Sequence, residues 1–264
     1  MRSNKENKFL TIITVCFNSQ DTIERTIASV LKIKNSDIEY LIIDGKSIDN
    51  TLKIINKYND KIDLIISEKD SGIYDAMNKG INKANGRFIT FLNSDDFYNT
   101  NQFLKYYNEI KSINKDYIYH SNINNMKNNV ILEKVYPHFS LSKMKYFGMT
   151  LNHPTFIVPN YIYKKFKFDH NFKILSDYKF TLLTMLSHIE YFYLNFTVVN
   201  YSIEGESSNF NQRIKEGFLI RKQIFGYGNV LIFSSLLRIT YGILSNIKNK
   251  IKNYLNKKIN KNEY

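Results

Sequence analysis

Residues 9–45 read FLTIITVCFNSQDTIERTIASVLKIKNSDIEYLIIDG, and this stretch decides the fold class. The run over 9–17 is continuously apolar and rich in β-branched side chains, which is typical of a strand buried on both faces. Apolar residues at helical spacing follow over 22–31, with Asp21 placed to cap the amino end, and a second apolar run covers 38–43. This order predicts a βαβ unit with parallel strands.

The alternation of strand and helix continues along the chain. Helices are expected over 52–58 and 74–84, and strands over 64–66 and 88–92. Gly86 is placed to end the second of these helices in the left-handed conformation. The order predicts an α/β fold in which a mostly parallel, Rossmann-like sheet is flanked by helices. Weaker patterns farther along predict one helix and two strands, at residues 102–113, 117–119 and 130–135.

The composition is that of a folded protein. Its 264 residues are 43% hydrophobic, which suits one α/β domain with additions or two small domains. Cys16 is the single cysteine, so a disulfide within the chain is excluded and a reducing compartment is expected. Residues 1–8 are polar and lack the apolar core of a signal peptide, so we expect a cytoplasmic protein.

The net charge of +13 is concentrated near the carboxyl end. From Arg213 onward, eleven Lys and Arg residues against two Glu residues give +9, which leaves +4 for residues 1–212. Apolar residues recur at helical spacing over 230–255 among lysines, and Arg238 inside the apolar part argues against a membrane-spanning helix. We therefore expect 213–264 to be a basic amphipathic helical extension that lies on an anionic membrane surface or packs on protein.

Polar side chains follow each predicted strand, where ligands bind in sheets of this kind. They are Asn18, Asp44, residues 68–72 and the pair Asp95-Asp96. Two adjacent carboxylates repel each other unless a cation or hydrogen-bond donors hold them. Mg²⁺ and Mn²⁺ bind one or two carboxylates together with phosphate oxygens and water. A turn or a helix cap is the alternative explanation for such a pair.

Two glycines accompany these polar residues. Gly45 follows Asp44 and admits close backbone approach, beside a carboxylate that can accept a hydrogen bond from a base or a ribose. Gly72 precedes a helix whose free amino-end N–H groups favour anions. Taken singly, the Asp44-Gly45 pair is explained by an ordinary turn and the segment at Gly72 by a plain capped helix. Together with the aspartate pair, however, they lie at the ends of consecutive strands, which favours one shared site.

Three motifs lie at the ends of predicted strands: TVCFN at 14–18, DGKSID at 44–49 and LNSDD at 92–96. By these motifs, residues 11–98 resemble glycosyltransferase family 2, a family of GT-A type. The stretch SEKDSGIYDAMNKG at 67–80 is similar to that of bacterial exopolysaccharide, O-antigen and colanic acid-type transferases. The resemblance implies an inverting transfer of a sugar from a nucleotide diphosphate sugar, expected to be a UDP-sugar, to a glycan or lipid-linked acceptor in bacterial surface polysaccharide biosynthesis.

The resemblance also implies roles for residues on the donor side. Phe17 stands where the family usually has a tyrosine and would stack on the nucleotide base. Asp96 would bind the divalent metal, Mn²⁺ or Mg²⁺. The other positions expected to contact the nucleotide sugar are Asn18, Asp44, Asp70, Gly72, Asn78 and Asp95.

On the acceptor side, LNHPTF at 151–156 and ILSDYKF at 174–180 look like family segments. By this resemblance Asp177 would be the base that takes the proton of the acceptor hydroxyl, and otherwise it is a helix cap. His153 would contact phosphate or acceptor, and the alternatives are a core histidine or a helix cap. The flexible Gly-Gly-x-Ser loop of the family is replaced by EGES at 204–207.

The resemblance implies a GT-A domain over 1–212, with a nucleotide-binding half over 1–98 and an acceptor-side half over 99–212, before the extension 213–264. Two other functions fit parts of the sequence: a sugar nucleotidyltransferase, and a non-catalytic basic module that binds a membrane or nucleic acid. The former would need a glycine-rich basic loop where NSQD stands at 18–21. We expect no nucleic acid partner, and a cytoplasmic location that includes the inner face of the membrane.

Overall fold

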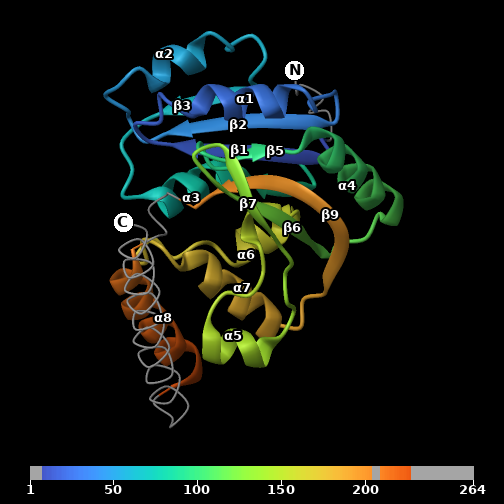
Figure 1. Ribbon diagram of the computed structural model, residues 1–264, viewed down its shortest axis with the longest axis vertical. Coiled ribbons are helices and arrows are strands. Elements are labelled where there is room, and N and C mark those ends of the chain that lie inside the picture. Colours follow the sequence, from blue (N-terminus) through green and yellow to red (C-terminus); the bar gives the residue numbers. More distant parts are fainter. Residues whose placement is uncertain (1–7, 204–208, 227–264) are drawn as a thin grey trace, which may run out of the picture.

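The central sheet of the computed structural model has the strand order β3-β2-β1-β4-β8 (Figure 1). The structure describes residues 8–203 and 209–226. The strands of this sheet are β1 (Leu10–Cys16), β2 (Ile38–Asp44), β3 (Leu64–Ser67), β4 (Phe88–Phe91) and β8 (Val158–Pro159). Because β1 to β4 are parallel and only β8 runs antiparallel to its neighbour, the predicted mostly parallel sheet is confirmed.

Strand β1 of the central sheet is buried on both faces, as its continuous apolar run predicts. Ile13 and Val15 belong to one hydrophobic cluster, whereas Leu10 and Ile12 belong to another. The first cluster includes side chains from α3 (Ile73–Lys83), α6 (Asn160–Lys165) and α7 (Ser176–Leu186). The second includes side chains from α1 (Ile23–Leu31), α2 (Thr51–Asn56) and α4 (Thr100–Ile113).

A second sheet has the strand order β5-β9-β6-β7. Its strands are β5 (Phe97–Tyr98), β9 (Tyr191–Ser202), β6 (Ile118–Lys127) and β7 (Val130–Val135). The strands predicted near 117–119 and at 130–135 correspond to β6 and β7, whereas the long, curved β9 is not predicted from the sequence (Figure 1). The other described helices are α5 (Leu141–Phe147), α8 (Phe210–Phe225) and a 3-10 helix at His153–Thr155.

Two local predictions are wrong. Asp21 does not cap α1, because Thr22 occupies the N-cap position. The side chain of Thr22 makes no capping hydrogen bond to the helix, and its N–H donates to the Ser19 carbonyl oxygen at 3.1 Å. Gly86 does not adopt a left-handed conformation. A Cβ atom at Gly86 would lie only 2.5 Å from the backbone nitrogen of Thr11. Glycine is needed here because β1 passes so close to the chain.

Helix α8 runs through the boundary expected between residues 212 and 213. Its side chains Glu216 and Ile220 are buried, and Ile220 lies in the same cluster as α3 and α7. The beginning of the basic region is therefore packed on the rest of the described chain, so the boundary inferred from charge falls inside a folded helix.

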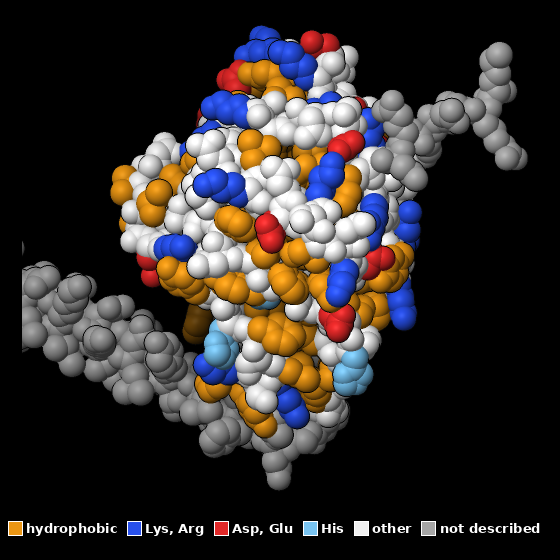
Figure 2. All heavy atoms as spheres, turned by 90° about the vertical axis from the view of Figure 1, so that its right-hand side faces the viewer, with side chains coloured by type: hydrophobic (Ala, Val, Ile, Leu, Met, Phe, Trp, Pro, Cys, Tyr) orange, Lys and Arg blue, Asp and Glu red, His pale blue; other side chains and the backbone are white. Residues whose placement is uncertain are grey.

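Two expected features lie outside the described residues, namely the helix over 230–255 and the EGES segment at 204–207. Within 8–203 and 209–226, no helix combines the length and apolar character that crossing a membrane requires. On the face shown in Figure 2, the Lys and Arg side chains are scattered among polar and apolar ones rather than gathered into one patch.

Candidate functional site

The loops that follow β1 and β2 are joined at the carboxyl edge of the central sheet. Asn18 has a φ of 49°, and its Oδ1 accepts a hydrogen bond from Ile48 N at 3.0 Å. The backbone nitrogen of Asn18 donates to Ser47 Oγ at 2.8 Å, and Gly45 N donates to Cys16 O at 2.9 Å. Asn18 thus shapes both loops, and its contact with a nucleotide sugar stays a prediction.

Phe17, Gly45 and Asp70 meet at one corner of this edge. A Cβ atom placed on Gly45 would lie 2.6 Å from Asp70 Oδ2 and 3.3 Å from the Phe17 ring. The Phe17 side chain is 59% exposed, so much of its ring is open to a ligand. Burial raises the pKa of Asp70, although the N–H of Gly72 donates to its Oδ1 at 3.0 Å. Three loops that are separate in sequence therefore combine an open ring with a carboxylate.

Asp44 lies at the predicted strand end but is fully buried. Its Oδ1 accepts a hydrogen bond from Ser47 Oγ at 2.5 Å, and its Oδ2 accepts one from Ser67 Oγ at 2.6 Å. Burial, reinforced by the charge of Asp44, raises the pKa of the neighbouring Cys16 thiol. The carboxylate of Asp44 thus ties the ends of β2 and β3 together, and its contact with a base stays a prediction.

Asp96 is completely buried at the end of the LNSDD segment. Its Oδ1 accepts a hydrogen bond from the backbone nitrogen of Ser202, at the end of β9, at 2.9 Å. Its Oδ2 is buried and has no hydrogen-bond partner. Burial raises the pKa of Asp96 well above its usual value, and the charge of Asp95 raises it further. An unpartnered buried carboxylate oxygen is costly, which makes a cation a suitable partner.

Helix α1 holds the backbone of the LNSDD segment. Thr26 Oγ1 lies 2.9 Å from Ser94 O and 2.7 Å from Asp96 O, and Arg25 Nη2 donates to Asp95 O at 3.0 Å. These contacts engage carbonyl oxygens of the segment, and Oδ2 of Asp96 stays without a hydrogen-bond partner. Neither Arg25 nor Thr26 is predicted from the sequence, because a partner 70 positions away leaves no local pattern.

The available side chains suit a hard divalent cation that takes few ligands from the protein. Across the described residues, no group of three or more His, Cys, Asp or Glu side chains could hold a metal ion. Mg²⁺ and Mn²⁺ are commonly bound by one or two carboxylates, with the remaining oxygens supplied by phosphate and water. The unpartnered Oδ2 of Asp96, with Asp95 beside it in the chain, meets that requirement.

The amino end of α3 is partly occupied by carboxylates of the chain itself. Gly72 precedes the helix with a φ of 132°, a conformation that favours glycine. The N–H of Ser71 donates to Asp75 Oδ2 at 2.9 Å, and that of Gly72 donates to Asp70 Oδ1. A phosphate would compete with these side chains, so the contact assigned to Gly72 stays a prediction.

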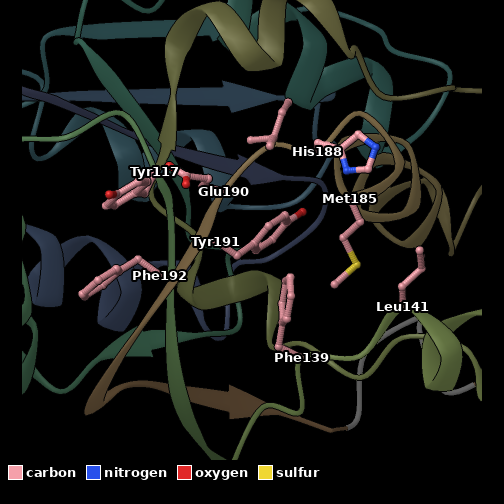
Figure 3. A pocket seen from close by; sticks show the side chains of 9 residues that line it. Tyr117, Phe139, Leu141, Met185, His188, Glu190, Tyr191 and Phe192 are labelled. Carbon is pink, nitrogen blue, oxygen red and sulfur yellow. The ribbon is translucent and has the colours of Figure 1, made fainter.

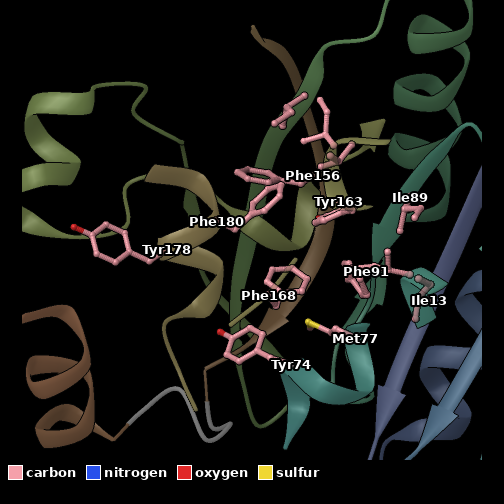
Figure 4. Packing of buried hydrophobic residues seen from close by; sticks show 14 of the residues in the cluster. Ile13, Tyr74, Met77, Ile89, Phe91, Phe156, Tyr163, Phe168, Tyr178 and Phe180 are labelled. Carbon is pink, nitrogen blue, oxygen red and sulfur yellow. The ribbon is translucent and has the colours of Figure 1, made fainter. Parts of the chain in front are cut away.

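Asn78 connects α3 to the acceptor-side half. Its Nδ2 donates to Phe168 O at 2.8 Å, and its Oδ1 accepts from Phe168 N at 3.1 Å. The ring of Phe168 packs against Tyr74 and Phe91 at centroid distances of 5.3 and 5.6 Å (Figure 4). Both ends of the Asn78 amide are engaged in this structural contact, and its contact with a sugar stays a prediction.

His153 lies in an aromatic cluster and is 8% exposed. Its ring stacks on the Phe91 ring at a centroid distance of 6.3 Å. It makes edge contacts with the rings of Phe156 and Phe168 at centroid distances of 5.3 and 5.7 Å. Burial lowers the pKa of His153, the charge of Asp177 opposes that shift, and Nε2 has no hydrogen-bond partner. These surroundings fit the core-histidine alternative, with a neutral imidazole near the candidate base.

Asp177 lies in the first turn of α7 and is partly exposed. Its Oδ1 accepts a hydrogen bond from Tyr178 N at 2.8 Å and lies 3.1 Å from the hydroxyl oxygen of Tyr74. Tyr74 belongs to α3, the helix that follows the Asp70 loop. The candidate base is therefore linked directly to the donor-side half of the chain.

Comparison of the sequence with models of known protein families identifies the family of this chain. The model described as glycosyl transferase family 2 matches residues 11–172, which is more than half of the chain. The chain belongs to glycosyl transferase family 2. The matched region contains the donor-side candidates of this family 2 chain and also His153, but it ends before Asp177.

Curated family 2 relatives match part of the chain. The putative teichuronic acid biosynthesis glycosyltransferase TuaG of Bacillus subtilis is 37% identical over 90 residues, 33% of this chain and 36% of TuaG. The Escherichia coli protein WfgD, named a UDP-Glc:alpha-D-GlcNAc-diphosphoundecaprenol beta-1,3-glucosyltransferase, is 36% identical over 98 residues, 37% of this chain and 39% of WfgD. The chain thus spans well under half the length of the curated relatives it matches.

Solved structures extend the similarity over most of the chain. S. aureus TarS 1–349, solved in complex with UDP-GlcNAc, superposes with a TM-score of 0.68 at 21% identity, covering 82% of this chain and 65% of TarS. Glucosyl-3-phosphoglycerate synthase of Mycobacterium tuberculosis was solved with Mn²⁺, UDP and phosphoglyceric acid. It superposes with a TM-score of 0.59 at 13% identity, covering 81% of this chain and 78% of the synthase. At these identities the likeness establishes the fold, which is the GT-A fold expected from the motifs.

A cavity of ≈ 460 Å³ lies away from the family 2 motifs (Figure 3). It is lined mainly by aromatic and apolar side chains, among them Phe139, Tyr191 and Phe192. Tyr191 begins β9, and Ser202, which contacts Asp96, ends the same strand. The cavity and the aspartate pair therefore lie at opposite ends of β9, and no predicted site residue lines the cavity.

Proposed function

We propose that this family 2 protein transfers a sugar, with inversion, from a nucleotide diphosphate sugar to a glycan or lipid-linked acceptor in bacterial surface polysaccharide synthesis. The observation that carries the proposal is the buried, unpartnered Oδ2 of Asp96 at the carboxyl edge of the sheet. The names of TuaG and WfgD support the substrate class. Family membership favours a transferase over a nucleotidyltransferase or a non-catalytic binding module.

The donor is proposed to be a UDP-sugar that binds across the ends of β1, β2 and β4. The open ring of Phe17 would stack on the uracil, and the close approach of Gly45 to Asp70 would bring backbone and carboxylate to the nucleoside. Asp95, in the segment that Arg25 holds, would contact the ribose or the metal shell. UDP-GlcNAc in the complex of TarS supports a uridine donor.

The cofactor is proposed to be Mn²⁺ or Mg²⁺, held by Asp96 and by the diphosphate of the donor. When bound, the cation would neutralise charge that develops on the departing diphosphate. Asp96 has no exposed surface, so its loading would require neighbouring parts of the chain to move. Mn²⁺ in the synthase of M. tuberculosis supports this class of ion.

Asp177 is proposed to remove the proton of the attacking acceptor hydroxyl. A carboxylate suits this role because it accepts hydrogen bonds and can bind a proton once the new glycosidic bond forms. The partial exposure of Asp177 gives an acceptor access to it, and the bonds to its Oδ1 limit its rotation.

The protein is proposed to act on the cytoplasmic side of the membrane. The diphosphoundecaprenol in the name of WfgD supports an acceptor anchored in a lipid bilayer. Contact of the basic stretch 213–264 with anionic lipid at the inner membrane face is part of this proposal, supported by its charge of +9.

A turnover assay with Mn²⁺, a panel of UDP-, GDP- and dTDP-sugars and lipid-linked acceptors tests the proposal. We expect UDP release that depends on the acceptor and stops when EDTA removes the metal. Release that continues at the same rate in EDTA would contradict the metal role. Release that ignores every acceptor would indicate hydrolysis, and absence of release with all donors would favour a binding module.

Replacing Gly45 by Ala is expected to weaken donor binding about tenfold while the protein stays folded. The new Cβ atom meets the mobile end of Asp70 at 2.6 Å, so the side chain can move away, but it then leaves the nucleoside corner. The dissociation constant for UDP, measured by calorimetry, checks this result.

The matched control for this substitution is Gly86→Ala. Its Cβ meets the backbone of Thr11 at 2.5 Å, so we expect a loss of about 1–3 kcal/mol in unfolding free energy without a change in UDP affinity. Equal UDP affinity for Gly45→Ala and the unsubstituted protein would remove Gly45 and Asp70 from the proposed nucleotide site.

A further inference from the structure

Glu216 of α8 is a buried carboxylate that binds three consecutive backbone amides. It is 3% exposed. Its Oε1 accepts a hydrogen bond from Lys173 N at 2.8 Å, and its Oε2 accepts bonds from Ile174 N and Leu175 N, both at 2.9 Å. Gln212, one turn earlier in α8, donates from Nε2 to Oε1 at 2.7 Å. Each oxygen of the Glu216 carboxylate therefore accepts two hydrogen bonds from the chain.

This arrangement goes beyond what burial of α8 requires. A carboxylate removed from water is costly, and an apolar residue would fill the same space at lower cost. Charge-assisted hydrogen bonds to several N–H groups offset that cost and restrict the geometry of the chain that donates them. The segment held in this way is the one that immediately precedes α7.

The peptide groups of residue Ile174 are held from two sides. Its N–H donates to Glu216, and its carbonyl oxygen accepts a hydrogen bond from the hydroxyl of Tyr74 at 2.7 Å. The same hydroxyl oxygen lies 3.1 Å from Asp177 Oδ1. Only Leu175 and Ser176 separate this residue from Asp177. The chain is thus clamped between α3 and α8 just before the candidate base.

We propose that Glu216 is a positioning residue for Asp177: by binding the amides of residues 173–175, it fixes the start of α7 and the direction of the Asp177 carboxylate. The inference rests on the proposed role of Asp177 as the base. Glu216 itself is buried, and its oxygens are engaged by the backbone of residues 173–175 and by Gln212, so its proposed role is to position the base and not to touch substrate. Its loss should lower the rate of transfer and leave the donor site intact, because misplacement of a catalytic group by about 1 Å can cost about a hundredfold in rate.

Glu216→Gln is the sharpest variant, because it keeps the size of the side chain but replaces one accepting oxygen by a donating NH₂ group. With a saturating UDP-sugar, we expect kcat for transfer to fall at least tenfold. The KM for the donor and the dissociation constant of UDP should stay within twofold, since no Glu216 partner lies in the donor loops. A loss in kcat alone indicates an interaction needed in the transition state.

Glu39→Gln is the matched control, because Glu39 is also a buried carboxylate that anchors backbone. Glu39 accepts hydrogen bonds from Thr11 Oγ1 at 2.6 Å and from Asn85 N at 2.8 Å, and it lies near the amino ends of the strands, remote from the site. We expect both variants to lower the melting temperature and only Glu216→Gln to lower kcat. If the two variants lower kcat equally, Glu216 is merely structural and the inference fails.

Two further variants keep the result interpretable. Gln212→Ala removes one partner of Glu216 at a half-buried position and should lower kcat severalfold even if Glu216→Gln does not fold. An unchanged kcat in Gln212→Ala, in that case, overturns the inference. Asp177→Asn is assayed in parallel: normal transfer by that variant means the proposed base is wrong, whereas normal transfer by Glu216→Gln beside an inactive Asp177→Asn means that positioning by Glu216 is wrong.

Discussion

Replacement of Asp96 by Asn is expected to abolish metal-dependent transfer, with a fall in kcat/KM of about a thousandfold. A metal ion contributes several kcal/mol by neutralising transition-state charge, and each ~1.4 kcal/mol corresponds to a factor of about ten in rate. Asn keeps the size of the side chain and an oxygen that can accept the bond from Ser202 N. It lacks the anionic oxygen that Asp96 Oδ2 would offer to the cation.

The expected stability of the Asp96→Asn variant separates loss of metal from loss of fold. Burial raises the pKa of Asp96 above its unfolded value, so the native protein binds this proton more tightly than the unfolded chain. Its contribution to stability is therefore complete at low pH and is lost as the pH rises through the raised pKa. Asn does not titrate, so at pH 8 and without metal the variant should melt no lower than the unsubstituted protein. Transfer at the normal rate, with normal dependence on Mn²⁺, would show that Asp96 is not the metal ligand.

Replacement of Asp177 by Asn is expected to remove transfer while donor binding persists. Loss of a general base typically costs about a hundred- to ten-thousandfold in rate. The amide oxygen of Asn can still accept from Tyr178 N and face Tyr74, so the first turn of α7 should keep its shape. Calorimetry with UDP should give an unchanged dissociation constant, and acceptor-dependent UDP release should disappear.

Asp169→Asn is the control for Asp177→Asn. Asp169 also lies beside α7, where its carboxylate pairs with Lys179 at 2.6 Å, but it has no proposed role in the reaction. We expect this variant to transfer sugar at a rate close to normal. If the two variants lose activity to the same degree, the loss reflects a disturbed α7 rather than a missing base.

The parts of the fold that follow from the sequence are those whose partners are close in the chain. β1 is apolar at every position because both of its faces are covered, and that pattern identifies a central parallel strand without further information. β9 was harder to predict because its first half is half exposed and its second half is buried, so no single period describes it. Gly86 shows a related limit, since its close approach to Thr11 depends on a strand 75 positions earlier.

In the candidate site, too, the positions of residues could be predicted where they depend on strand order, and their long-range contacts could not. Phe17, Asp44 and Asp96 follow strands of one sheet, so their common edge could be predicted from strand order. The contacts that hold them could not, since Ser202 reaches Asp96 across 106 positions and Glu216 reaches Lys173 across 43. Family resemblance places Asn78 in the diphosphate or sugar pocket, which stays a prediction, and the hydrogen bonds between its amide and Phe168 leave no signal in the sequence.

The contact between α8 and the start of α7 limits how this sequence can be recombined with others. A chimera that joins residues 1–212 to the remainder of another chain would cut α8 between Gln212 and Glu216. The amides of residues 173–175 would then depend on whatever side chain the other parent supplies. A chimera should therefore take the whole segment from α7 through α8 from one parent sequence, even when only acceptor preference is to be altered.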